Sequence, residues 1–201
     1  SYYLLARFVA GEVFHVDSVV NDGKVVFAGT NQYGRPPMQV AHQGGAYISR
    51  TLARGSVDEK TLLATNKKLI TALGLERGAT HAEFIKSDAD RKFYFLEIAA
   101  RVGSAYIADV LEAASGVNLW REWARLEIAD GKPTSKVRPL RKDYAGIILS
   151  LAKQEQPDTS AYVDTEIIYR VKKRHHAGLI VRAPRLERVN ELLDEYGRRF
   201  V

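Results

Sequence analysis

The chain has 201 residues, of which 46% are hydrophobic and 27% are charged, and these ordinary values exclude a disordered or fibrous protein. It contains no cysteine, which excludes disulfides, thiolate nucleophiles and cysteine-ligated metals and favours a cytoplasmic location. The net charge of +6 indicates an anionic partner, and phosphate esters, nucleic acid and membrane surfaces all qualify. No apolar stretch approaches the ~20 residues that span a bilayer, so we expect no membrane-spanning segment.

Three segments near the start, residues 4–9, 13–20 and 24–32, are rich in β-branched and aromatic residues and predict a three-stranded meander. Residues 33–47 contain several glycines and prolines and predict a loop. Ser56 and Glu59 then form a capping box. Apolar residues follow it at helical spacing and predict a helix that ends at Gly74.

The next elements are a second hairpin, with strands at residues 81–86 and 92–99, and two helices. The first helix ends at Gly116 and the second is capped by Asn118. After a basic, proline-containing linker come three apolar runs and a closing amphipathic helix. The pattern predicts an α+β fold with a mainly antiparallel sheet flanked by helices. Its predicted parts are a larger subdomain at residues 1–131, a linker at 132–142 and a small α+β subdomain at 143–201.

Two carboxylates are predicted to face each other in the second hairpin. A turn centred on Asp90 pairs residues whose numbers sum to 180, which places Glu83 opposite Glu97 on the same face. Opposed carboxylates repel each other, so we expect a cation between them. Magnesium fits because it prefers oxygen ligands, and it is usually bound together with a polyphosphate. The alternative is a solvated face on which Glu83 pairs with Lys86 or Arg101.

The chain contains neither a P-loop nor a Rossmann glycine motif, so nucleotide binding would need another design. Three motifs in register provide one: GEVFHVD at residues 11–17, HAEFI at 81–85 and FLEIAARVG at 95–103. In this order and spacing they resemble the C-terminal half of the ATP-grasp fold. The nearest likeness is to carboxylate–amine ligases of the L-amino-acid ligase type, with biotin carboxylase and carbamoyl phosphate synthetase more distant.

The resemblance implies specific site residues. Glu83 and Glu97 match the ligands of ATP-bound magnesium, or of manganese in its place, and Arg101 matches the arginine that holds the γ-phosphate or an acyl phosphate. Many members have an asparagine ligand where this chain has Ala99, a change that either marks the L-amino-acid ligases or lowers activity. Three further expectations concern ATP: a hinge strand at residues 5–9 whose backbone, including Arg7 and Val9, meets adenine; His15 beside the ribose; and the pair Gln39 and His42.

The resemblance also implies a ligase that acts on small carboxylate and amine substrates through an acyl phosphate, with ATP and magnesium as cofactors. Family members clamp ATP between two subdomains, and this chain begins at Ser1 within a predicted strand. We therefore expect a fragment that lacks the N-terminal domains of the same protein and is inactive alone. Family members are often dimers, which makes a homodimer one candidate assembly.

A second reading of the sequence is a non-catalytic binding module whose basic surface docks nucleic acid or a partner protein. Its best feature is the basic run at residues 170–176. A solvated hairpin end explains the same charges, and no aromatic residues are interleaved for base stacking. We therefore expect no nucleic acid partner.

Overall fold

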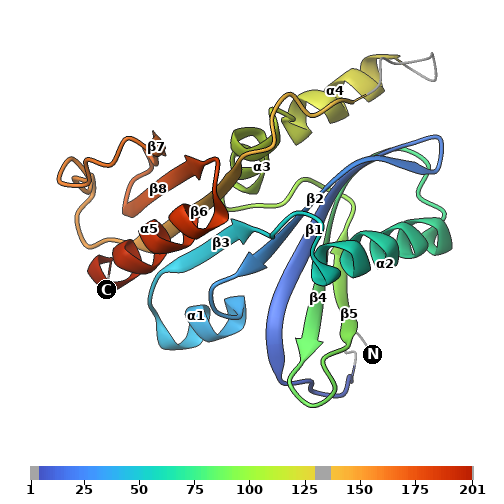
Figure 1. Cartoon of the computed structure of the whole chain (residues 1–201), viewed down its shortest axis with the longest axis horizontal. Coiled ribbons are helices and arrows are strands. Elements are labelled where there is room, and N and C mark those ends of the chain that lie inside the picture. The colour runs from blue at the N-terminus through green and yellow to red at the C-terminus, as the bar shows by residue number, and fades with distance from the viewer. Residues whose placement is uncertain (1–4, 130–136, 201) are drawn as a thin grey trace.

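The computed structural model describes residues 5–129 and 137–200, which form an α+β fold with an antiparallel sheet, as predicted (Figure 1). Every strand pair in the sheet is antiparallel, and the strand order is β5-β4-β1-β2-β3-β6-β8-β7. The strands are β1 Gly11–Asn21, β2 Lys24–Tyr33, β3 Tyr47–Thr51, β4 Gly78–Ser87, β5 Phe93–Ala99, β6 Tyr144–Leu151, β7 Ile167–Arg170 and β8 His176–Ala183. The helices are α1 Pro37–Gln43, α2 Val57–Leu73, α3 Ile107–Ser115, α4 Leu119–Ala129 and α5 Leu186–Arg199.

The helices cover the two faces of the sheet. On one face α3 and α4 pack over Val19 and Ala79, and α3 continues over Ile147. On the other face α2 packs over Phe14 and its neighbours, and α5 packs over Ile148. Because side chains alternate along a strand, His15, Asp17 and Val19 share the α3/α4 face.

The helix ends follow their sequence signals. The Ser56 hydroxyl accepts the amide of Glu59 at 3.1 Å, and Glu59 accepts the amide of Gly55, so the predicted capping box is confirmed with a shift of one residue. Gly74 ends α2 in the left-handed region, at φ 65°. The Asn118 side chain accepts the amide of Arg121 at 3.0 Å and caps α4 as predicted.

Three predictions for the first part of the chain were wrong. Residues 5–10 form no strand, and Leu5 and Phe8 are 98% and 88% exposed, so their apolar pattern does not reflect pairing within the described chain. The predicted loop at residues 33–47 contains the short helix α1. The strand β3 was not predicted, although it joins the two halves of the sheet through its pairing with β2 and β6.

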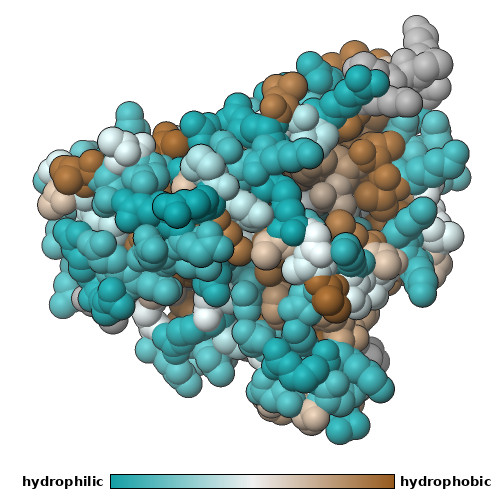
Figure 2. All heavy atoms as spheres, in the orientation of Figure 1, coloured by the Kyte–Doolittle hydropathy of each residue, from teal (hydrophilic) through white to brown (hydrophobic). Residues whose placement is uncertain are grey.

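The C-terminal segment continues the sheet that the first part begins, because β6 pairs along β3. The described part of the segment predicted as a small subdomain, residues 143–200, therefore shares one sheet with residues 5–129. Part of the predicted linker, residues 132–136, lies outside the described residues. The predicted closing helix is confirmed as α5: its apolar side is buried, and its outer face is hydrophilic in Figure 2. Among the helices described, none has the length and apolar composition needed to cross a membrane.

Candidate metal centre

The two carboxylates predicted to face each other are direct partners in the sheet. Glu83 on β4 pairs with Glu97 on β5, and residues directly opposite in an antiparallel pair point to the same face. This face also carries His15 and Asp17, because His15 is the partner of Glu83 on β1 and Asp17 is the partner of His81. The predicted juxtaposition is therefore confirmed.

The register that produces this pair differs from the predicted one near the turn. Next to the turn, the Ser87 amide donates to the Lys92 carbonyl oxygen. The numbers of paired residues therefore sum to 179 there, rather than to the predicted 180. A bulge on β5 between the partners of Glu83 and Phe84 inserts Leu96 and restores the sum of 180 from Glu83 onward. The bulge thus places Glu97, rather than Leu96, opposite Glu83.

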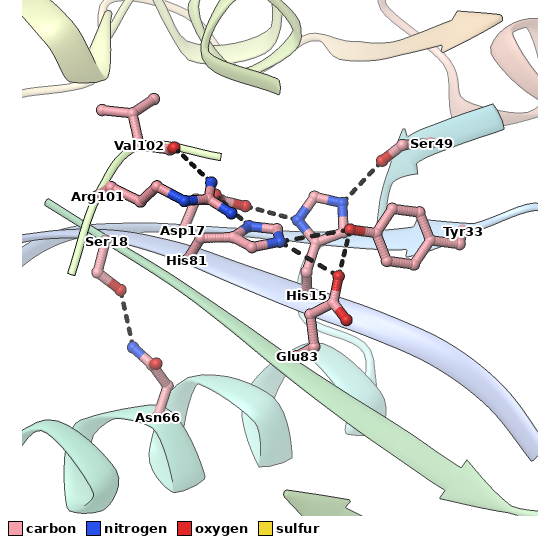
Figure 3. A network of polar contacts seen from close by, with 10 residues as sticks. All are labelled: His15, Asp17, Ser18, Tyr33, Ser49, Asn66, His81, Glu83, Arg101 and Val102. Carbon is pink, nitrogen blue, oxygen red and sulfur yellow. Dashed lines mark hydrogen bonds and ion pairs between the residues drawn. The ribbon is translucent and has the colours of Figure 1, made fainter. Parts of the chain in front are cut away.

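The surroundings of Glu83 differ from the solvated face considered as an alternative (Figure 3). Its side chain is only 13% exposed, and Oε1 accepts a hydrogen bond from the Tyr33 hydroxyl at 2.6 Å. His81 Nε2 lies 3.3 Å from the same oxygen. Lys86, one of the partners considered, instead pairs with Asp58 at 2.6 Å. The alternative pairing of Glu83 with a surface cation is therefore wrong.

A buried polar chain continues from His81 into the sheet (Figure 3). His81 Nδ1 donates to Asp17 Oδ1 at 2.8 Å, and His15 Nδ1 donates to Asp17 Oδ2 at 2.5 Å. His15 Nε2 is hydrogen-bonded to the Ser49 hydroxyl at 2.8 Å. Asp17 and His15 are fully buried, so each of these contacts replaces a lost contact with water.

These contacts set the protonation states of the residues in this buried polar chain. Burial raises the pKa of Asp17, but the charge and hydrogen bonds of His15 and His81 outweigh burial and lower this pKa to about 2. Burial lowers the pKa of His81, but the bonds to Asp17 and Glu83 outweigh it and raise this pKa to about 9. Burial raises the pKa of Glu83, but the donors His81 and Tyr33 hold it below its ordinary value. Near neutral pH both carboxylates are ionised and His81 is a cation.

The loop between β5 and α3 lies directly against this buried polar chain. A Cβ built on Gly103 would lie 2.7 Å from Asp17 Oδ1 and 2.9 Å from His81 Nδ1, so only glycine fits there. Arg101, two residues earlier in the loop, donates from Nη1 to the Val102 carbonyl at 2.9 Å. The loop therefore carries the predicted phosphate-binding arginine to the side of the sheet where the carboxylates stand.

The donor set fits a hard divalent cation such as magnesium. Glu97 is exposed and has no hydrogen-bond or ion-pair partner among residues 5–129 and 137–200, so its carboxylate charge is not balanced there. Glu83 offers a second ionised carboxylate on the same face. Oxygen ligands of this kind suit magnesium or manganese rather than softer metals.

A second group of potential ligands is His15, Asp17 and His81, whose ligating atoms lie within 4.8 Å of one another. All three are buried, and their facing atoms already hydrogen-bond one another. We therefore assign this group to the support of the sheet face rather than to a cation.

Of the other residues predicted from the sequence to contact ATP, one lies within this buried polar chain and the rest lie outside it. His15 is fully buried with both ring nitrogens bonded, which leaves neither nitrogen accessible to a ribose. Gln39 and His42 lie on the exposed short helix α1, and their side chains make no contact with Glu83 or Glu97 among the bonds of the described residues. Arg7 and Val9 lie in the segment that forms no strand, so the prediction of a hinge strand at residues 5–9 was wrong.

Sequence reasoning missed Asp17, His81, Tyr33 and Ser49 as members of the site. One signal was present: His15 with Asp17, and His81 with Glu83, are polar pairs two residues apart within otherwise apolar strands. Such spacing places both members of a pair on one face. The pairing of β1 with β4, which joins the two pairs, was not predicted.

Comparison with known proteins identifies the fold. No family model matches the chain. No curated protein matches it either. Among solved structures, the chain is similar to phosphoribosylglycinamide synthetase from Anaerococcus prevotii, at 16% identity and a TM-score of 0.71 over 94% of this chain and 52% of that one.

Two further ligase structures show the same likeness. The L-amino acid ligase from Bacillus licheniformis matches at 19% identity and a TM-score of 0.65, over 94% of this chain and 51% of that chain. Carboxyaminoimidazole ribonucleotide synthase from Aspergillus clavatus, solved with ATP, matches at 13% identity and a TM-score of 0.68, over 94% and 51%. These proteins are ATP-grasp ligases, so the chain has the ATP-grasp fold, and it spans about half the length of the structures it matches.

Proposed function

We propose that this chain is the metal-binding half of an ATP-dependent ligase that joins a carboxylate to an amine or a thiol. The observation that carries the proposal is the pairing of Glu83 with Glu97 on neighbouring strands of an ATP-grasp fold. The two carboxylates would hold magnesium, or manganese in its place, together with the phosphates of ATP. A bound cation of this kind would spread the negative charge of the phosphate oxygens.

The reaction would run in two displacements. An oxygen of the substrate carboxylate attacks the γ-phosphorus of ATP, the bond to ADP breaks, and an acyl phosphate forms. The amine then attacks the acyl carbon, loses a proton and releases inorganic phosphate. Both steps move negative charge, so they depend on electrostatic positioning more than on a protein base.

Within this chain, Arg101 would bind the transferring phosphoryl group. Its loop packs against Asp17 and His81 through Gly103, which fixes the backbone from which Arg101 extends. A guanidinium offers two parallel donors to phosphate oxygens and cannot lose its charge at neutral pH. Gln39 and His42 remain candidates for contacts with ATP, because α1 precedes β3 at the centre of the sheet.

The half of the ligase structures that this chain does not match would supply the rest of the ATP clamp and the substrate sites. We therefore propose that the chain binds a divalent cation but does not turn over alone. A homodimer is one candidate assembly of the complete protein.

The proposal is tested by magnesium-dependent release of ADP from a protein that contains this chain together with both ATP-grasp halves, across a panel of carboxylates and amines. We expect activity that Glu97→Gln lowers at least a hundredfold, because that variant loses a cation ligand. Glu76→Gln, at an exposed glutamate that precedes β4, is the matched control. A Glu97→Gln variant with normal ligation would overturn the proposal.

A further inference from the structure

The two oxygens of the Glu83 carboxylate have different surroundings. Oε1 accepts the Tyr33 hydroxyl at 2.6 Å and lies 3.3 Å from His81 Nε2. Among the described residues, Oε2 makes no hydrogen bond or ion pair. One oxygen is therefore held by the protein, and the other is left for a ligand.

The donor Tyr33 is itself fixed. Its ring packs on His15, with ring centroids 4.7 Å apart, and on Tyr47 at 5.6 Å. Tyr33 is only 5% exposed, and its hydroxyl donates to Glu83 Oε1 from this buried position. The hydroxyl also lies 3.4 Å from His81 Nε2, which brings both donors to the same carboxylate oxygen.

The donor His81 is fixed from its other side. Asp17 accepts from His81 Nδ1 and also from His15, so the imidazole cannot turn without breaking a fully buried carboxylate contact. Gly103 closes the same space against Asp17 and His81. The ring thus presents Nε2 toward Glu83 in a single orientation.

We propose that Tyr33 and His81 are positioning residues that hold Glu83 Oε1, so that Glu83 offers only Oε2 to the divalent cation it shares with Glu97. This inference rests on the proposed function, because it concerns the cation of that site. Its consequence is cation selectivity. Magnesium and manganese bind in near-octahedral geometry and accept one oxygen from a carboxylate, whereas calcium is larger and readily takes both. A glutamate with one available oxygen therefore favours magnesium over calcium.

The test measures manganese binding to the 201-residue chain by electron paramagnetic resonance of the free ion, with magnesium and calcium as competitors. For the wild-type chain, we expect calcium to need about tenfold higher concentrations than magnesium to displace manganese. Tyr33→Phe removes the closer of the two donors to Oε1 and leaves only His81 at 3.3 Å, so we expect it to move this ratio toward calcium by about tenfold. Tyr169→Phe, whose ring packs on Tyr106 away from Glu83, is the matched control and should keep the wild-type ratio.

The outcomes separate the two proposals. Manganese binding that Glu97→Gln removes, with an unchanged ratio in Tyr33→Phe, would overturn this inference and leave the proposed function intact. If wild-type chain binds no manganese at all, both are overturned. Where Tyr33→Phe fails to fold, as judged by circular dichroism, the wild-type ratio still decides: calcium competing as well as magnesium would contradict the inference.

Discussion

Glu83 and Glu97 are direct partners across β4 and β5, yet only Glu83 has its carboxylate held by neighbouring side chains. Glu97 has no such partner among the described residues and is exposed. The pair therefore combines one fixed ligand with one adjustable ligand. This combination allows a cation to bind the free oxygen of the held carboxylate, Glu83 Oε2, while the exposed Glu97 side chain adjusts to it.

The first prediction concerns the stability of the metal-free chain. Like charges directly opposite in a sheet are destabilising by roughly 0.2–1 kcal/mol, so Glu97→Gln should raise the free energy of unfolding by about that amount without a divalent cation. Magnesium should then stabilise the wild-type chain and not the variant. Urea unfolding with and without magnesium measures both effects. Equal stabilisation of the two proteins by magnesium would show that Glu97 is not a ligand.

The second prediction concerns Gly103, which packs on the buried polar chain at Asp17 and His81. Gly103→Ala places a methyl group against Asp17 and His81, so it should lower the free energy of unfolding by about 1–3 kcal/mol. The same substitution at Gly197, inside α5, meets only Ile48 at 3.5 Å and should raise stability by about 0.5–1 kcal/mol through helix propensity. Chemical unfolding of both variants provides the comparison. A neutral Gly103→Ala would mean that the loop is not seated as described.

The third prediction concerns the pH dependence given by Asp17. Its folded pKa of about 2 lies below the ordinary value of 3.8, so its stabilisation is present above pH 3.8 and is lost as pH falls toward 2. The size of this contribution is about 2 kcal/mol. Asp17→Asn breaks a buried pair and should cost about 3 kcal/mol at pH 6. The difference between the two proteins should narrow as the pH falls below 4.

Thermal unfolding at several pH values between 3 and 6 measures that difference. Asp194→Asn, on the exposed side of α5, is the matched control and should track the wild-type chain. A gap between Asp17→Asn and the wild-type chain that widens on acidification would contradict the assigned charge of Asp17.

The fourth prediction concerns the basic run considered as a nucleic acid site. Arg170 donates to the carbonyl oxygens of Thr159 and Tyr162, and Arg174 pairs with Glu155 at 2.8 Å, so these two cations serve the local fold. We therefore expect weak retention on heparin that the double variant Lys172→Ala, Lys173→Ala barely changes. Strong, salt-dependent retention abolished by that variant would support the binding-module reading instead.

Local patterns predicted the elements that depend on neighbouring residues. The capping box at Ser56 and the helix stop at Gly74 rest on contacts within a few residues, and both were confirmed. The Glu83–Glu97 pair was also found from a local turn, although a bulge at Leu96 compensates for a turn centre that differs by half a residue. The prediction was thus correct in its residues and wrong in its detailed register.

Long-range pairing explains most of what was missed. Asp17 and His81 are 64 positions apart, and only the pairing of β1 with β4 brings them together. The short strand β3 follows a glycine-rich segment and gains its place through β6, about a hundred residues later. The apolar residues Leu5 and Phe8 resemble a strand, but no partner strand accepts them among the described residues. Composition and periodicity do not encode such partners.

The most direct measurement of the central claim is a crystal structure of the chain soaked with manganese, located by its anomalous scattering. We predict a peak between Glu83 and Glu97, about 2.1 Å from Glu83 Oε2, with Oε1 still bonded to Tyr33. A peak among His15, Asp17 and His81, or no peak near the two glutamates at manganese concentrations that saturate binding in solution, would contradict it.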